Sequence, residues 1–182
     1  MDPLARKRQE NIAGYIISMW HLEDLLRASR FDLKVIEQHL IGPMDDDPEA
    51  QEELREWYRD LVERMHEEGV ERQGHLSEVE EVLGELETLH RSLTEVLNDE
   101  EYAALYAQAL PGITTLQKQA GEEALPPIET CFTAVYGVMV LRAQNKEVAP
   151  ATLEAERHMR RLLERLADHY RNMHRLPGVS LN

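Results

Sequence analysis

The chain has 182 residues, of which 35 are acidic and 20 basic, and a formal net charge of −15 at pH 7. A domain of this length buries enough of its surface to fold without disulfides or a structural metal ion. So acidic a surface repels nucleic acid and anionic membranes, and the sequence lacks the basic patch that phosphate groups require. We therefore expect one domain whose partners include neither nucleic acid nor a membrane.

The sequence also indicates the compartment. The only cysteine, Cys131, has no partner within the chain, so an intramolecular disulfide is impossible and a reducing compartment is expected. The N-terminal segment MDPLARKRQENIAG is charged and lacks the apolar core of a signal peptide. No apolar run approaches the ~20 residues that a membrane span needs. We expect a cytoplasmic protein.

The apolar period is helical from the N-terminal region onward. One apolar face extends over residues 6–30, and a short helix follows, for which Asp32 is a candidate N-cap. Asp47 before Pro48 is the favoured pair of cap and first helical residue, and it predicts a helix that ends near Gly69.

The middle of the chain continues this pattern. Its leucine and valine spacing predicts a helix over residues 75–97. Asn98 and Glu101 have the spacing of a capping box, so a new helix is expected to begin at Asn98. Pro111 should kink or break that helix, because proline lacks the backbone N–H and clashes with the preceding turn.

Residues 128–144 read IETCFTAVYGVMVLRAQ and are apolar on almost every side, which is typical of a helix at the centre of a fold. The last helix is predicted from about Pro150 to His174, followed by a C-terminal tail over residues 175–182. No segment has the period of a strand. The sequence predicts an all-α fold, a single-domain bundle of about six to seven helices over residues 1–174 with a hydrophobic central helix.

Two Glu-x-x-His motifs resemble those of di-metal carboxylate bundles, Glu63 with His66 and Glu87 with His90. Helical geometry turns Glu63 and His66 away from the apolar face of their helix, toward water. His90 lies in its own apolar face, with Glu87 at the edge of that face. Because the two motifs cannot converge, we expect no metal site and assign His90 to the core.

Catalytic motifs are missing as well. The sequence contains no Gly-rich phosphate loop, paired-cysteine zinc pattern or nucleophile elbow. Cys131 lies near the start of its predicted helix, where the helix dipole could lower its pKa, but its neighbours are apolar. We expect a buried structural thiol, since a Cys-His enzyme needs a histidine that the sequence cannot place. No catalytic residue and no cofactor are assigned.

Glu23 interrupts the strongly apolar stretch YIISMWHLEDLLRASR. A lone ionised carboxylate on the apolar face of a helix would cost several kcal/mol, so a cation or several donors must meet it. Arg27 at the next turn, Arg30 and Arg142 are the candidate cations.

Two interpretations of Glu23 remain open. In the first, Glu23 belongs to a structural buried pair that fixes helix register. In the second, Glu23, Arg27 or Arg142 holds a small polar ligand in a pocket among aromatic side chains. The candidate walls of that pocket are Trp20, Trp57, Tyr58 and Tyr136.

Several long segments of the chain are distinctive, in the order ENIAGYIISMWHLEDLLRA, EWYRDLVERMHEEGV, GHLSEV, LPGITTLQKQAG and IETCFTAVYGVMVLRAQNKEVAPAT. Together they resemble a bacterial group, the domain of unknown function 4924 family, over residues 9–152. The resemblance implies a cytoplasmic single-domain bacterial protein and assigns no activity, cofactor or catalytic residue. The central positions of the pattern are Trp20, Glu23, Asp24, Arg27, Trp57, Tyr58, Glu129, Cys131, Tyr136 and Arg142.

Two classes of function therefore remain. The absence of a catalytic constellation favours a non-enzymatic cytoplasmic helical protein that acts through self-association or a protein partner, which the sequence does not name. The alternative is a helical bundle that binds a small molecule in a polar pocket near Glu23 and Arg142, a class that includes enzymes. We expect a homodimer rather than a monomer, because Trp20, Leu25 and Leu89 extend the apolar area beyond one helix face.

Overall fold

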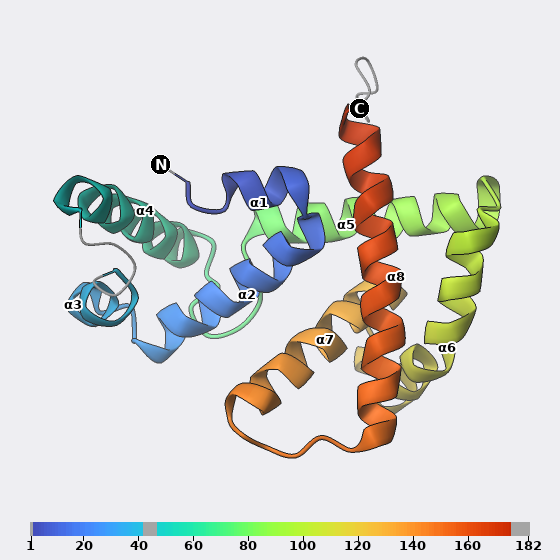
Figure 1. Cartoon of the computed structure of the whole chain (residues 1–182). Helices are drawn as coiled ribbons and strands as arrows, with labels where there is room; N and C mark the ends of the chain where they lie inside the picture. The colour runs from blue at the N-terminus through green and yellow to red at the C-terminus, as the bar shows by residue number, and fades with distance from the viewer. Residues whose placement is uncertain (1, 42–46, 176–182) are drawn as a thin grey trace. The chain divides into compact units, whose positions relative to one another are not determined.

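The computed structural model describes residues 2–41 and 47–175, and within them the chain is helical, with eight α-helices and no strand (Figure 1). The predicted all-α fold is confirmed. The chain forms two compact units, the first made of residues 1–10 and 14–81 and the second of residues 11–13 and 82–182. The single domain predicted over residues 1–174 stays a prediction. Most of the predicted tail, residues 176–182, lies outside the described residues.

The first unit ends within helix α5 (Ser77–Arg91). Its other elements are α1 (Ala5–Glu10), α2 (Ile12–Ala28), α3 (Leu33–Ile36), the π-helical turn η1 (Glu37–Ile41) and α4 (Pro48–Glu67). The sequence predicts one helix over residues 6–30, and this is wrong at Asn11, which separates α1 from α2. Asparagine favours such a break, because its side chain competes for backbone hydrogen bonds and suits an N-cap.

The predicted caps of the first unit are confirmed. The Asp32 carboxylate accepts a hydrogen bond from the Lys34 backbone N–H at 2.9 Å, ahead of α3. Asp47 accepts one from the Glu49 N–H at 3.3 Å, ahead of α4. Gly69 follows the end of α4 with a φ of +71°, a conformation that glycine adopts at little cost.

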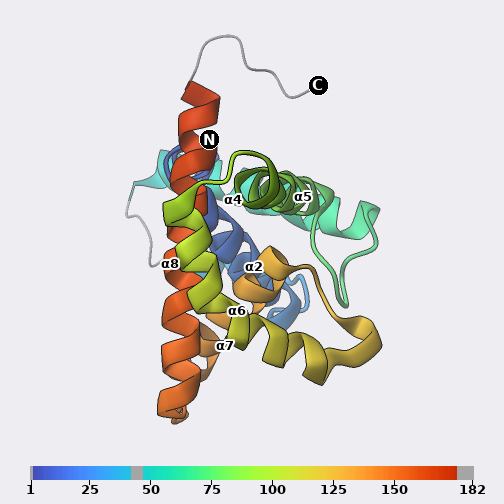
Figure 2. The same cartoon turned by 90° about the vertical axis from the view of Figure 1, so that its right-hand side faces the viewer.

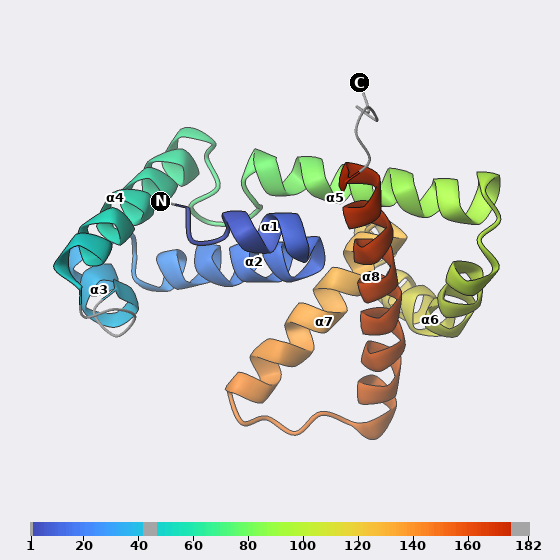
Figure 3. The same ribbon diagram turned by 45° about the horizontal axis from the view of Figure 1, so that its top comes forward.

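The second unit contains the remainder of α5, the π-helical turn η2 (Ser92–Val96), α6 (Glu100–Ala120), the 3₁₀ turn η3 (Gly121–Glu123), α7 (Pro127–Ala143) and α8 (Pro150–Arg175). Helix α8 packs along both α6 and α7, and α6 also contacts α7. The two helices α7 and α8 diverge toward the loop that joins them (Figures 1 and 3). These three helices build the candidate site.

Helix α6 begins one residue later than the capping-box spacing predicts. Asp99, not Asn98, is the N-cap, and its carboxylate accepts a hydrogen bond from the Tyr102 N–H at 2.8 Å. Asn98 has a φ of 49°, the left-handed conformation that asparagine tolerates between two helices. Pro111 lies inside α6, which remains one helix but changes direction along its length (Figure 2), so the predicted kink is confirmed and a break is not.

Helix α7 packs into the core mainly along one side. Ile128, Cys131, Phe132 and Val135 are buried in the core, whereas the opposite side carries half-buried or exposed residues together with Thr130 and Val138, which are buried but line a pocket. The helix predicted to be central over residues 128–144 therefore contributes one face to the core. Its second apolar side borders an open pocket.

Candidate functional site

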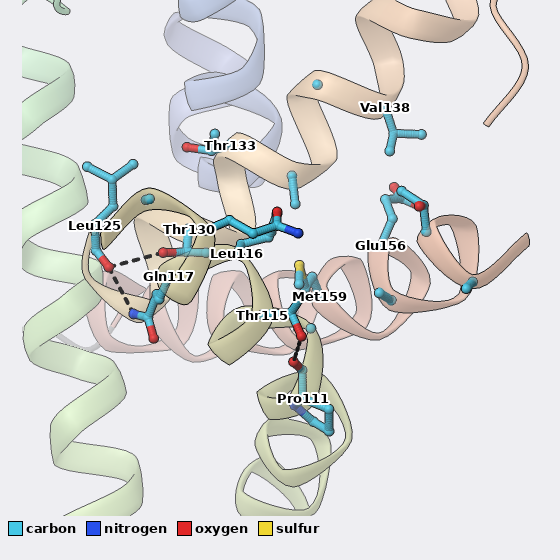
Figure 4. Close-up of a pocket in the computed structure, with 18 of the residues that line it drawn as sticks. Pro111, Thr115, Leu116, Gln117, Leu125, Thr130, Thr133, Val138, Glu156 and Met159 are labelled. Atoms are coloured by element: carbon cyan, nitrogen blue, oxygen red, sulfur yellow. Dashed lines mark hydrogen bonds between the residues drawn. The ribbon is translucent and has the colours of Figure 1, made fainter. Parts of the chain in front are cut away.

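The second unit contains a pocket of about 840 Å³ between the C-terminal half of α6, α7 and α8 (Figure 4). All of its lining residues lie in the range 111–159. From α7, the side of Ala134, Gly137, Val138 and Leu141 faces the pocket. Pockets that hold drug-sized molecules have volumes of about 300–1,000 Å³. The space is therefore large enough for an organic ligand.

Small side chains create this space. Gly112 lets α6 approach α8 closely, because a Cβ atom there would lie 2.7 Å from Met159 Cε and 3.1 Å from Ala155 Cβ. Gly137 on α7 has the opposite surroundings, since apart from its chain neighbours and the adjacent helix backbone no described atom lies within 4 Å of the position of its missing Cβ. Gly112 therefore allows close packing of α6 on α8, and Gly137 leaves room in the pocket.

The polar side chains of one end of the pocket donate their hydrogen bonds to the protein backbone. The Thr130 hydroxyl donates to the Pro126 carbonyl at 2.8 Å, and the Gln117 side-chain N–H donates to the Leu125 carbonyl at 2.9 Å (Figure 4). The Thr115 hydroxyl likewise donates to the carbonyl one turn earlier, at 2.8 Å. The two threonines consequently present acceptor oxygens to a ligand, and Gln117 presents its amide oxygen and its second N–H.

Glu156 on α8 is the one charged side chain among the described residues that line the pocket. Its exposed fraction is 5%, unusual for a carboxylate. Its carboxylate accepts a hydrogen bond from Arg160, one turn further along α8, whose side chain is 45% exposed. The pocket thus has a nearly buried negative charge whose counter-charge reaches toward solvent.

The first unit holds the polar group that the sequence singles out. Glu23 is fully buried, and its two carboxylate oxygens accept hydrogen bonds from the Leu76 backbone N–H at 3.0 Å and from His75 Nδ1 at 2.5 Å. The indole of Trp20 stacks on the His75 ring, with centroids 4.5 Å apart and planes at 10°. The burial predicted for Glu23 is confirmed, with a histidine and a backbone amide as its partners.

Arg27 does not pair with Glu23 as predicted. Its guanidinium donates to the carbonyls of Val70 and Gly74, at 3.0 and 2.5 Å, and forms an ion pair with Asp24 at 3.0 Å. Glu23 and Arg27 together hold residues 70–76 against α2, just before α5 begins. This arrangement supports the structural interpretation, in which polar groups of one helix fix the path of a loop.

The remaining candidate residues are dispersed. Trp57 is half-buried and meets Tyr58 edge to face at 5.0 Å, and Tyr58 lines a small cavity of about 50 Å³ in the first unit. Tyr136 is half-buried on α7, and Arg142, near the end of α7, is exposed. None of the seven candidate site residues, all within the described ranges, lines the large pocket. The pairing of Arg142 with Glu23 stays a prediction.

The Glu-x-x-His motifs behave as the helical geometry predicts. Glu63 and His66 are exposed. His90 is buried, bonds through Nδ1 to the Tyr102 hydroxyl at 2.9 Å, and has its pKa lowered by burial, which favours a neutral ring. Glu87 accepts the backbone N–H groups of two residues at the start of α7, at 2.6 and 3.0 Å. In the part of the chain that the structure describes, no three His, Cys, Asp or Glu side chains gather around a possible metal position.

Cys131 is fully buried in α7. Burial raises the pKa of the Cys131 thiol to about 12, so the predicted buried thiol is confirmed and a reactive thiolate is not formed at neutral pH. Across residues 2–41 and 47–175, no single helix is both long and apolar enough to cross a membrane. One bent pair, Glu100–Glu123 with Pro127–Ala143, satisfies length and composition together, at an angle of 102°.

Comparison with known proteins identifies the family. The sequence matches the family described as "Domain of unknown function (DUF4924)" over residues 1–176, nearly its whole length. The chain belongs to the DUF4924 family. The resemblance found in the sequence is therefore confirmed. No curated protein and no solved structure matches the chain.

In this DUF4924 protein, the pocket is the feature that sequence reasoning missed. One signal was available: α7 is apolar on more sides than one helix packed in a small bundle needs. Glycine and alanine on its second side, Ala134 and Gly137, were a further sign that nothing bulky fills that space. The residues on α6 and α8 that close the pocket have no sequence signature of their own.

Proposed function

We propose that this DUF4924 protein is a non-enzymatic binding protein and that the pocket between α6, α7 and α8 holds a small molecule with an apolar body. The observation that carries the proposal is the second apolar side of α7, which opens on about 840 Å³ of space. An open pocket lined by alanine, valine and leucine side chains leaves apolar surface in contact with water, and a ligand with an apolar body would be stabilised by covering that surface.

The chemistry of the lining supports binding over catalysis. Glu156 is the one ionisable side chain among the described lining residues, which include no histidine, cysteine, lysine or tyrosine. Acid–base or nucleophilic catalysis generally needs at least two such groups in mutual reach. The buried thiol of Cys131 and the His90 imidazole lie in the core and do not line the pocket.

A pair of glycine substitutions tests this proposal. Gly137→Leu places a side chain into the pocket, while Gly84→Leu places the same side chain at an exposed helical glycine with equally open surroundings. The neutral dye Nile red should bind the wild type and Gly84→Leu and lose at least about tenfold in affinity for Gly137→Leu, because the cavity is filled. Circular dichroism checks that both variants keep their helical content. Equal dye binding by both variants, or no binding by the wild type, would refute the proposal.

A second function is favoured by a separate observation. Val96, the last residue of η2, and Leu97, which follows it, are 73% and 66% exposed, the most exposed large apolar residues described. We propose self-association or a protein partner at this turn, with a homodimer as the simplest form, since apolar pairs on a surface are often covered in assemblies. Trp20 and Leu89, which suggested a dimer in the sequence, are buried within the chain and no longer support it.

Light scattering tests the assembly. A homodimer should give twice the 21.1 kDa of the chain at tens of micromolar, and Val96→Ser with Leu97→Ser should return it to the monomer mass. A monomer mass for the wild type would refute self-association. We place the protein in the cytoplasm of a bacterium, a proposal supported by its single cysteine, which has no partner for a disulfide within the chain.

A further inference from the structure

We infer that the ligand of this pocket is an amphipathic amine, a molecule with an apolar body and one protonated amino group that pairs with Glu156. The inference rests on the proposed function, since it names the ligand class of the same pocket. It is drawn from the donors, acceptors and charges of the lining. The apolar lining alone would suit any hydrophobic molecule, so these polar groups decide the class.

The pocket offers acceptors to a ligand. The hydroxyl protons of Thr115 and Thr130 and one of the two side-chain N–H groups of Gln117 are directed to backbone carbonyls. Thr133 follows the same pattern, donating to a carbonyl one turn earlier at 2.9 Å. A threonine oxygen or amide oxygen in this state can only accept. A ligand rich in acceptors, such as a carboxylate or phosphate, would find few donors among these groups.

The other polar side chains of the lining, Gln119 and Thr152, are exposed. Thr115 and Thr133 are exposed as well. Water can hydrate all four whether or not a ligand is bound, so they discriminate less between ligands than the nearly buried Glu156 does.

The charge of the pocket points the same way. Glu156 is nearly buried, and no lysine, arginine or histidine is among the described lining residues. An anionic ligand would meet the Glu156 carboxylate from the pocket side, while the cation that pairs with it, Arg160, does not line the pocket, so like charges would face each other. A protonated amine would instead form a charge-assisted hydrogen bond with Glu156.

Arg160 does not prevent Glu156 from pairing with a ligand. It pairs with Glu156 from the solvent side, with 45% of its side chain exposed, and it does not line the pocket. A carboxylate has two oxygens and about four lone-pair positions, so it accepts a second donor without releasing the first. The ammonium group and Arg160 can therefore share the carboxylate.

The position of Glu156 orients the ligand. In Figure 4, Glu156 lies at one end of the pocket and the group of Thr130, Gln117 and Leu125 at the other, with Met159 and Thr115 between them. The amino group belongs at the Glu156 end, and the apolar body extends along the side of α7. A terminal hydroxyl or amide N–H on that body would meet the acceptors of Gln117 and Thr130.

Three probes with the same chain and different head groups test the inference. Decylamine, decanol and decanoate, each below its critical micelle concentration, displace Nile red from the wild type at about 0.15 M salt, where surface charges are screened beyond about 8 Å. We expect decylamine to bind at least about tenfold more tightly than decanol, the usual strength of one charge-assisted hydrogen bond, and decanoate to bind most weakly.

Matched variants separate Glu156 from the general acidity of the protein. Glu156→Gln should remove the preference for decylamine over decanol, while Glu154→Gln, on the exposed side of α8, should keep it. Arg160→Met retains the Glu156 carboxylate, removes the cation that partly neutralises it and should increase the affinity for decylamine severalfold. If circular dichroism shows that Glu156→Gln is poorly folded, the affinity of Arg160→Met for decylamine tests the role of Glu156 instead.

The outcomes distinguish the two proposals. If none of the three probes binds and Nile red does not bind, the pocket is no ligand site and the proposed function fails. If the probes bind but decanoate equals or exceeds decylamine, the pocket binds apolar molecules and the amine inference is wrong. An amine preference that persists unchanged in both Glu156→Gln and Arg160→Met comes from the acidic surface and also overturns the inference.

Discussion

Removing the Glu23 carboxylate should destabilise the first unit by about 3 kcal/mol. Glu23→Ala leaves the buried Leu76 N–H without its acceptor, a loss of about 1–3 kcal/mol, and removes the bond to His75. His75 is 25% exposed and can turn to water, so its share of the loss is smaller than that of a fully buried cation. The sum lies at the lower end of the about 3–5 kcal/mol measured when one member of a buried pair is removed.

Urea unfolding followed by tryptophan fluorescence measures this loss. Both tryptophans of the sequence, Trp20 and Trp57, belong to the first unit, so the signal reports that unit even if the second unfolds separately. Glu23→Gln keeps one acceptor oxygen and should lose about 1–2 kcal/mol. Asp24→Ala is the matched control on the same helix, and because its ion pair with Arg27 is half-exposed it should lose less than about 1 kcal/mol.

A double-mutant cycle identifies the partner. Glu23→Ala combined with His75→Ala should lose clearly less than the sum of the two single variants, with a coupling of about 1–2 kcal/mol, because both remove the same bond. Arg142→Ala, at an exposed position, should stay within about 0.5 kcal/mol of the wild type. A Glu23→Ala protein as stable as the wild type would show that the buried hydrogen bonds contribute nothing, and additive losses with His75→Ala would disprove the pairing.

Three further outcomes are expected. In thermal unfolding, Gly84→Ala should stabilise the chain by about 0.5–1 kcal/mol, because alanine favours a helix more than glycine does. Gly112→Ala should not stabilise it, because the new Cβ would lie 2.7 Å from Met159 and 3.1 Å from Ala155. Equal gains in stability would contradict the close packing of α6 on α8. Cys131 should react with an aromatic disulfide reagent only on unfolding. Burial raises the pKa of the Cys131 thiol from 9.0 to about 12, so as the pH rises the thiol ionises in the unfolded chain before it does in the folded protein. The free energy of unfolding should therefore fall between about pH 9 and pH 12. A stability that does not change with pH in this range would contradict the burial of Cys131. Elemental analysis of the purified protein should find no stoichiometric iron, manganese or zinc, and one equivalent of any of them would overturn the expectation.

The sequence predicted the helices well because helix formation depends mainly on local features. Apolar spacing and the caps at Asp32 and Asp47 involve neighbours within one or two turns, so they are readable without tertiary structure. The errors were local as well: Asn11 interrupts an apolar face that reads as continuous, and Asp99 competes with Asn98 for the same cap. A single sequence cannot rank two adjacent residues of similar capping preference.

The sequence also determined that Glu23 is buried, because its place on an apolar helix face follows from the helical period alone. Only the tertiary structure decided its partner. His75 is 52 residues away and lies in a loop, whereas Arg27 is one turn away and looked the nearer choice. Because Glu23 and His75 are far apart in the sequence, no local sequence pattern predicts their pairing.

The pocket was decided by tertiary structure alone. The sequence of α7 shows that the helix is apolar. Whether other helices cover a given side of α7 depends on the directions of α6 and α8, which follow from Pro111 within α6 and the loop between α7 and α8. A helix that is apolar all round reads as fully buried when its neighbours are unknown. Close packing at Gly112 and open space at Gly137 arise from residues on different helices, and glycine looks the same in the sequence in both places. Local periodicity therefore predicted which residues avoid water, and the packing of separate helices determined which of them face an open pocket.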